Sequence, residues 1–177
     1  SQDVLHIVVH GAQTHGASPW AGVDPVAVSA EIILGLQTIV SRQIDLTRSP
    51  AVVTVASIHG GVRSNIIPSD ITMLGTIRTL DPEMREDIHA RVKKTAESIA
   101  ASAGATAEVA IDRGVPVTYN DPALTGRMLP SLKRVFGEDK VFLSRAHTGA
   151  EDFAYFAEQR PSFFFFLGVR TPGTDIK

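Results

Sequence analysis

A histidine stands in a glycine-containing loop near the start of the chain, within the segment QTHGASPW at residues 13–20. Because glycine removes side-chain bulk, a histidine in such a loop can approach a substrate closely. His15 could then donate a hydrogen bond to an oxyanion that develops during a reaction. The alternative is a loop histidine that only bonds the local backbone, and the residues alone leave both interpretations open.

A second group of polar residues carries donors suited to a carboxylate. Asn65 and Arg63 lie in the turn GGVRSNIIP at 60–68, and Arg78 lies in the strand-like GTIR at 75–78. Amide and guanidinium groups of this kind can bind a carboxylate. Each residue also has an ordinary structural interpretation, as a turn residue or as an arginine extended along a sheet edge. Only in combination do they indicate recognition of a substrate carboxylate.

The acidic pair Glu151-Asp152, in the segment HTGAEDF, could serve a metal ion or a proton transfer. We favour a capping box instead, because Thr148 and Glu151 have the Thr-x-x-Glu spacing that opens a helix. Asp152 would also suit the positive end of that helix.

A metal site made from this chain's residues is not expected. There are no cysteines, and the six histidines are scattered, whereas a metal needs three or four convergent ligands. His6 and His10 share one face of a half-exposed strand by period two. His89 falls near the buried side of a helix and is predicted to lie at the surface or the boundary.

The elements that position these residues follow the order βαββαβ, the split ferredoxin-like arrangement of four antiparallel strands against two helices. An edge strand and the open face of such a sheet need cover, from a partner subunit or a larger domain. Strands are predicted over residues 4–10, 51–59, 71–80 and 105–111, and helices from Asp24-Pro25 and from Asp81-Pro82 to Gly104.

Beyond a linker at 114–120 the pattern changes to a partial α/β segment. A helix is predicted from Asp121-Pro122 to near Gly137, and a second helix from Thr148 to about Glu158. Strands are predicted over 141–143 and 163–167, the latter a continuous apolar run of the kind buried in a parallel sheet. This segment is too small for a closed domain, so we expect it to complete a sheet whose other strands lie elsewhere.

Composition excludes several classes of function. The chain has 177 residues, 44% of them hydrophobic, and a formal net charge of -2, with no Lys/Arg cluster, so a nucleic-acid partner is not expected. No apolar run reaches the roughly 18 residues that cross a bilayer, so no membrane partner is expected either. No signal peptide is visible, which leaves the compartment open, with the cytoplasm as the default expectation.

Three segments together resemble one enzyme family. GAQTHGASPWAGVDPV, GGVRSNIIPSDITMLGTIRTLD and HTGAEDFAYFAEQRPSFFFFLGV occur in this order in the dinuclear-metal amidohydrolases, and the resemblance covers nearly the whole chain. That family includes hippurate hydrolase, auxin-conjugate amidohydrolases, aminoacylases and glutamate carboxypeptidases. It implies that residues 3–114 are a lid domain, which forms a homodimer through a helix and an edge strand. Residues 117–177 would be the end of the α/β catalytic domain.

The resemblance also implies roles for residues. His15 would reach the active site of the partner subunit and stabilise the tetrahedral intermediate, while Asn65 and Arg78 would hold the substrate carboxylate. The implied substrate is a small N-acyl amino acid or peptide, and the implied cofactors are two divalent metal ions, zinc or manganese. The family's metal-binding segments are not in this sequence, so we expect no metal on this chain and no activity from it alone. The alternative is a non-catalytic dimerisation or ligand-binding module.

Overall fold

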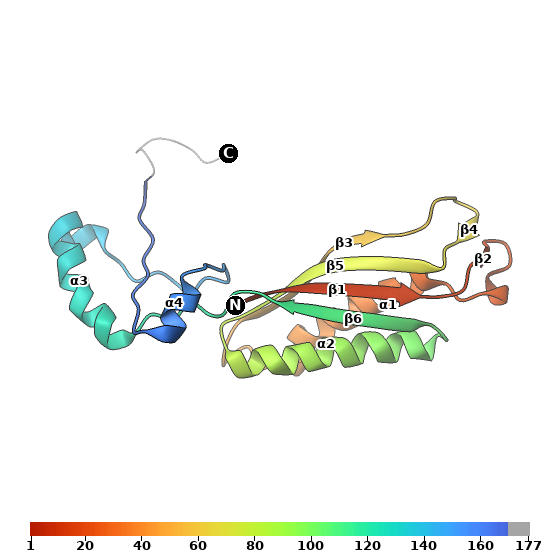
Figure 1. Ribbon diagram of the computed structural model, residues 1–177, viewed down its shortest axis with the longest axis horizontal. Coiled ribbons are helices and arrows are strands. Elements are labelled where there is room, and N and C mark those ends of the chain that lie inside the picture. Colours follow the sequence, from red (N-terminus) through yellow and green to blue (C-terminus); the bar gives the residue numbers. More distant parts are fainter. Residues whose placement is uncertain (170–177) are drawn as a thin grey trace. The chain divides into compact units, whose positions relative to one another are not determined.

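The computed structural model describes residues 1–169, and these residues form two compact units (Figure 1). The first unit contains Ser1–Val117 together with His147–Ala150. The second contains Thr118–Ala146 and the chain from Glu151 onward. Residues 170–177, the last part of the predicted catalytic-domain segment, lie outside the described residues.

The first unit is built on a four-stranded antiparallel sheet with the strand order β3-β5-β1-β6. Two helices lie against one face of this sheet, as the sequence predicts (Figure 1). The central pair runs in register from Gln2 opposite Arg78 to His10 opposite Asp70. The bounds are β1 Gln2–His10, α1 Pro25–Thr38, β3 Ala51–His59, β5 Asp70–Thr79, α2 Pro82–Ser102 and β6 Thr106–Arg113.

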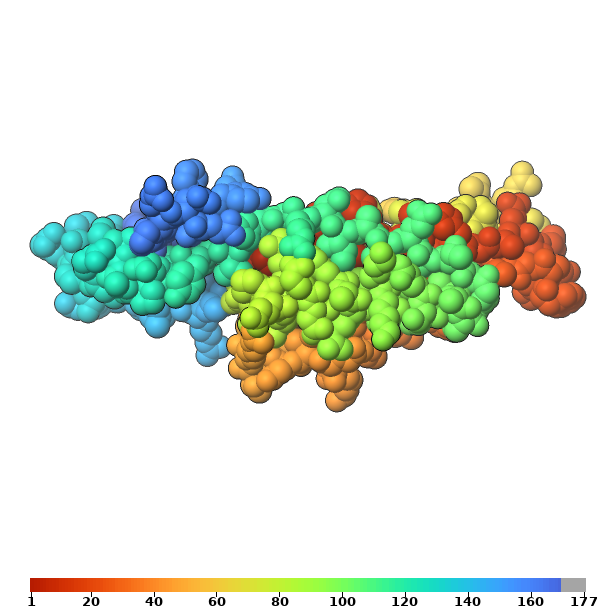
Figure 2. All heavy atoms as spheres, turned by 60° about the horizontal axis from the view of Figure 1, so that its bottom comes forward, coloured from red at the N-terminus to blue at the C-terminus, as the bar shows by residue number. Residues whose placement is uncertain are grey.

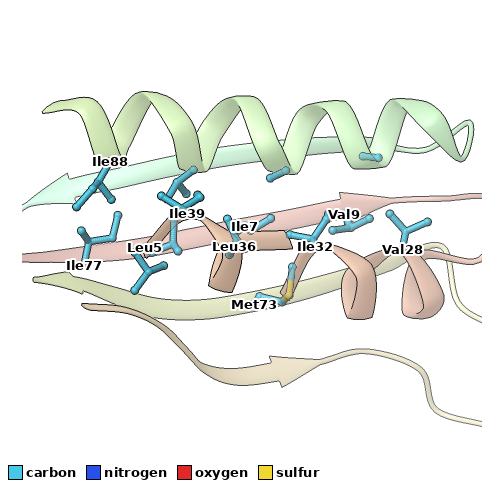
Figure 3. Close-up of a cluster of buried hydrophobic side chains, with 14 of the residues drawn as sticks. Leu5, Ile7, Val9, Val28, Ile32, Leu36, Ile39, Met73, Ile77 and Ile88 are labelled. Atoms are coloured by element: carbon cyan, nitrogen blue, oxygen red, sulfur yellow. The ribbon is translucent and has the colours of Figure 1, made fainter. Parts of the chain in front are cut away.

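A single hydrophobic core fills the space between this sheet and its helices, because inward-facing residues alternate along the strands. In β1 every second residue is buried, and the same alternation runs through most of β5. The helices contribute apolar residues at helical spacing, and Figure 2 shows α2 (yellow-green) packed against the orange segment of α1. Figure 3 shows the core, which includes Leu5, Ile7, Val9, Ile32, Leu36, Met73, Ile77 and Ile88.

Each of the two long helices begins at an Asp-Pro pair for the same local reason. The carboxylate of Asp24 accepts a hydrogen bond from the Val26 amide (2.8 Å), and that of Asp81 accepts one from the Met84 amide (2.9 Å). Proline then occupies the first helical position, where no backbone donor is lost. Gly104 follows α2 with a φ of 76°, which suits glycine at a helix end.

In the second unit helix α3 matches the prediction. Helix α3 (Pro122–Phe136) begins at Asp121, whose carboxylate accepts from the Leu124 amide (2.7 Å). The strands expected at 141–143 and 163–167 do not form in the described residues. A strand needs neighbours for its backbone groups, and at Phe164 the side-chain amide of Asn120 bonds both the backbone N–H (2.7 Å) and the C=O (2.8 Å) instead.

The predicted capping box at Thr148 is also wrong. The helix begins later, as α4 (Ala154–Gln159), and no side chain caps its start. The carbonyl of Thr148 instead accepts a hydrogen bond from Arg78 Nη1 (3.3 Å) in the first unit. Within residues 1–169, none of the helices combines the length and the apolar character needed to cross a membrane.

Candidate active-site arm

The predicted catalytic histidine lies on an arm at one end of the four-stranded sheet (Figure 1). We call residues 11–24 and 60–69 the arm. They continue the chain beyond the end of β1 and before the start of β5, and they include the two-stranded sheet of β2 (Thr14–His15) and β4 (Ile66–Ile67). A bridge between Ala12 and Val23 closes its base, and Gly22 is required there because a Cβ would lie 2.3 Å from the Ala12 carbonyl oxygen.

The ring of His15 is held in one tautomer by the loop that carries it. The backbone N–H of Ala17 donates to His15 Nδ1 at 3.0 Å. A nitrogen that accepts this bond must present its lone pair, so the ring N–H lies on Nε2. The side chain is exposed, and Nε2 is therefore a hydrogen-bond donor available to a molecule outside this chain.

Asn65 lies beside His15 on the same arm. His15 pairs with Ile66 across the β2–β4 ladder, and the Gly16 amide donates to the Asn65 carbonyl at 2.8 Å. The Asn65 side chain is exposed, as is that of Arg63 two residues earlier. The arm also exposes Trp20 (82%) and Val62 (100%), so it carries both polar donors and apolar surface.

Arg78 lies at the opposite end of the sheet, away from His15 and Asn65. It is on the open face of β5, opposite Gln2, while the arm begins beyond Asp70 at the other end of the same strand. Eight residue steps separate Asp70 from Arg78, a span of about 26 Å. One copy of the chain therefore brings His15 and Asn65 together but does not bring Arg78 to them.

A buried ionic cluster that was not predicted lies near the Arg78 end. The Asp3 side chain is fully buried and accepts hydrogen bonds from Arg85 Nε (2.8 Å), His89 Nε2 (2.7 Å) and the Gly114 amide (3.1 Å). His89 lies at the boundary of the core, one of the two placements predicted for it, and its pairing with Asp3 was not predicted. Period two along β1 places Asp3 on the same face as Leu5, which was the available signal.

No metal centre is found among residues 1–169, where no group of three or more His, Asp or Glu side chains is arranged to hold an ion. The donor set of the described residues therefore does not fit the two divalent ions that the resemblance implies. The arm offers hydrogen-bond donors, and its chemistry is recognition of an oxyanion or a carboxylate.

The four-stranded sheet with two helices on one face, extended by the arm, is the fold of a peptidase dimerisation domain. The chain belongs to the family of the peptidase dimerisation domain, whose model matches residues 4–103. This confirms the family predicted from the three sequence segments. The relatives are amidohydrolases, deacetylases and carboxypeptidases.

Three relatives show how the chain is related to complete enzymes. Thermostable carboxypeptidase 2 of Saccharolobus solfataricus is 37% identical over 169 residues, covering 95% of this chain and 42% of that protein. N-acetyldiaminopimelate deacetylase of Limosilactobacillus fermentum is 38% identical over 167 residues, covering 93% and 43%. A Bacillus subtilis structure described as a dinuclear metal binding peptidase from the M20 family is 29% identical, with a TM-score of 0.71, covering 91% and 38%. The chain spans about two fifths of the length of these relatives.

Proposed function

We propose that the protein hydrolyses the amide bond of N-acyl amino acids or small peptides as a homodimer. In this proposal residues 3–114 form the lid and dimerisation domain, and residues 117–177 belong to the catalytic domain. The relatives support hydrolysis of an amide bond as the reaction class, since one is named a carboxypeptidase and another a deacetylase. Both names describe cleavage of an amide bond, and the acyl group and amino acid are the finer part of the proposal.

The observation that carries the proposal is the donor at His15 Nε2. In amide hydrolysis the carbonyl oxygen gains negative charge in the tetrahedral intermediate, and a fixed donor aimed at that oxygen lowers the barrier. The Ala17 N–H fixes the ring from behind at 3.0 Å, so the donor is oriented before substrate arrives. His15 is thus proposed to be catalytic, with Asn65 beside it as a substrate-binding residue.

Each active site is proposed to draw on both subunits. The carboxylate carbon and the acyl carbon of an N-acyl amino acid are joined through only two atoms and lie within about 4 Å of each other. Arg78 and the arm are separated by about 26 Å along β5, so one chain cannot apply both to one substrate. Arg78 would therefore bind the substrate carboxylate in its own subunit's site, and His15 with Asn65 would enter the partner's site.

The surface proposed for dimerisation is the edge strand β3 with the neighbouring helix α1. Strand β3 is paired only on the side of β5 in the four-strand order, so its other side offers backbone groups to a second copy. Both elements expose apolar side chains, among them Val26, Leu34, Val52 and Ile58.

Two divalent metal ions, zinc or manganese, are proposed for the complete protein, with ligands outside the described residues. When bound they would supply an activated water for hydrolysis. The contribution of this chain is independent of their identity: it orients the substrate carboxylate and offers a donor to the oxyanion.

The test compares the full-length protein with a His15→Ala variant, using a panel of N-acetyl, N-benzoyl and indole-acetyl amino acids. Removing one oxyanion donor lowers kcat by about 100- to 1000-fold, or roughly 3–4 kcal/mol. His6→Ala is the matched control, because His6 is a partly exposed histidine in the middle of β1, outside the arm and outside the proposed dimerisation surface. Activity that survives His15→Ala would remove His15 from the mechanism. No turnover of any amide by the folded, metal-loaded dimer would favour the non-catalytic alternative.

Mixed dimers test the shared site directly. His15→Ala and Arg78→Ala subunits are each expected to be nearly inactive, but a heterodimer of the two has one site with both residues intact. After subunit exchange in a 1:1 mixture, about a quarter of the wild-type activity should return, since half of the dimers are mixed and one of their two sites is complete. No recovery despite demonstrated exchange would refute sharing of the site.

A further inference from the structure

We propose that His10, together with Asp70 and Glu108, is a positioning group for the His15 arm, holding the arm in place while His10 is protonated and releasing it when His10 loses its proton. The importance of this for turnover rests on the proposed function of His15. We call the cluster of His10, Asp70 and Glu108 the latch. It is a property of the four-stranded sheet and can be tested without measuring catalysis.

The latch occupies the last rung of the four-stranded sheet. His10 is the final residue of β1, Asp70 is the first residue of β5, and these two are register partners. His10 Nδ1 lies 2.6 Å from Asp70 Oδ1, and His10 Nε2 lies 3.5 Å from Glu108 Oε1 on β6. One imidazole therefore lies between two carboxylates that belong to the strands on either side of it.

This placement has a definite chemical consequence. A neutral imidazole has one N–H, so it can donate to only one of the two carboxylates and must turn a lone pair toward the other. His10 Nε2 is also shielded from solvent and has no hydrogen-bond partner among the described residues, whereas the Glu108 carboxylate beside it is largely exposed. Only the doubly protonated ring offers a proton to both sides.

The titration follows from the same contacts. The hydrogen bond to Asp70 raises the pKa of His10 and outweighs the opposing effect of desolvation, and the charge of Glu108 adds to the increase. The pKa of Asp70 is lowered, first by its bond from the Ser69 hydroxyl and then by His10. A raised histidine pKa means that the stabilisation is complete below the ordinary value of about 6.5 and is lost as pH rises through the raised pKa.

The other charged groups on this face of the sheet do not replace His10. On β1 the next titratable residue of the same face is His6, four positions back, and its Nε2 lies 3.5 Å from Asp112 Oδ2 on β6. From β5 only Asp70 faces His10 with a charge, and from β6 only Glu108 does so among the described contacts. The helices pack on the opposite face.

The arm is attached directly to this rung. Both of its segments leave the sheet here, one after His10 and the other before Asp70. The Gly11 amide donates to the Ser69 carbonyl at 2.7 Å, one step outside the latch, and the next pairing outward is the β2–β4 ladder that carries His15. Loosening the His10–Asp70 pair therefore removes support from the first contact of the arm.

The test is hydrogen–deuterium exchange of the arm amides in the full-length dimer between pH 6 and pH 10, corrected for intrinsic exchange rates. The wild-type arm is expected to lose protection by about two- to fivefold as pH rises, the range of an exposed ion pair. His10→Gln, which keeps an amide donor for Asp70 but does not titrate, should show no such transition. Glu108→Gln should move the midpoint to lower pH, because one of the two carboxylates that favour the proton is gone. His6→Gln is the matched control and should keep the wild-type transition.

Two results would overturn the latch: protection of the wild-type arm that does not change with pH, or a transition that persists unchanged in His10→Gln. Ring NMR signals of His10 in the same samples supply a second measurement, whose midpoint must coincide with the exchange transition. Because neither readout uses catalysis, failure of the proposed hydrolysis would leave the latch standing, and failure of the latch would leave the role of His15 standing.

Discussion

Replacing Asp3 by alanine should be the most damaging polar substitution in the first unit. The Asp3 carboxylate is fully buried and bonds Arg85 through both of its oxygens, in addition to His89 Nε2 and the Gly114 amide. These partners come from α2 and from the segment that follows β6, so one side chain ties the start of β1 to two distant parts of the chain.

The magnitude follows from what the substitution leaves behind. The Arg85 side chain is only 12% exposed, so Asp3→Ala strands a largely desolvated guanidinium. Removing one partner of such a pair costs about 3–5 kcal/mol, out of roughly 5–15 kcal/mol for a typical protein. The double variant with Arg85→Ala should cost less than the sum of the two single variants, since no unpaired charge remains.

Asp3 should also determine part of the loss of stability at acidic pH. Burial alone would raise the pKa of Asp3, but the hydrogen bonds from Arg85 and His89 outweigh it and hold that pKa below its ordinary value. A lowered carboxylate pKa means that the stabilisation is present above the unfolded value of about 3.9 and is lost as pH falls through the folded pKa. Asp3→Ala should therefore lose less stability than wild type on acidification.

Urea denaturation followed by circular dichroism, at pH 7 and in steps down to pH 3, measures both effects. Asp87→Ala is the matched control, because Asp87 pairs with Arg91 (2.9 Å) on the exposed face of α2, the helix that carries Arg85. This substitution should lower the free energy of unfolding by well under about 1 kcal/mol. A loss below about 1 kcal/mol for Asp3→Ala, additive with that of Arg85→Ala, would refute the buried-pair reasoning.

Two local substitutions test the framework of the sheet and of α1. Gly75→Ala should lower stability and loosen β3, because a Cβ at Gly75 would lie 2.1 Å from the Thr54 carbonyl oxygen; thermal melting checks the stability, and unchanged melting would mean that β3 shifts freely. Asp24→Ala should lower the free energy of unfolding by about 1 kcal/mol, measured by urea denaturation, because it removes the hydrogen bond from the Val26 amide (2.8 Å). Asp24→Asn should keep most of that stability, since its side-chain oxygen can accept the same bond. A similar loss in both variants would argue against capping.

Local chemistry explains why three helix starts and most of the first unit could be predicted from the sequence. Asp-Pro at 24–25, 81–82 and 121–122 starts a helix in each case, because the cap and the proline act within three residues. In β1 and β5 apolar residues recur at every second position, and this pattern predicts which side chains are buried. The inward residues Leu5 and Met73 are where period two places them.

The wrong predictions depend on partners that a local pattern does not contain. The apolar run at 163–167 has the composition of a buried strand, yet a strand exists only where neighbours accept its backbone bonds. At Phe164 those bonds go to Asn120, and Phe166 is 63% exposed. The capping box failed for a similar reason, since the Thr148 carbonyl bonds Arg78, 70 residues away in sequence.

The candidate site was predictable in residue type but not in arrangement. A glycine-flanked histidine and an Asn-x-x-Pro turn suggested donors for a substrate, and the β2–β4 ladder places His15 and Asn65 together. The separation of Arg78 from the arm lies along one strand, β5, and was already contained in the predicted strand at 71–80. The adjacency of His15 and Asn65 depends instead on the pairing of β2 with β4, two segments about 50 residues apart in sequence, which is a property of the assembled arm.

Strand β1 has an ionic group at each end, and the two groups respond to pH in opposite ranges. Asp3, the second residue of β1, is buried and its pKa is lowered, so its cluster is lost only in acid. His10, the last residue, is on the open face and its pKa is raised, so its latch is lost only as pH rises. Between these limits both ends of the strand are fixed. Toward alkaline pH the Asp3 end stays fixed while the arm that carries His15 is released, so activity that depends on His15 should decline there before the sheet itself unfolds.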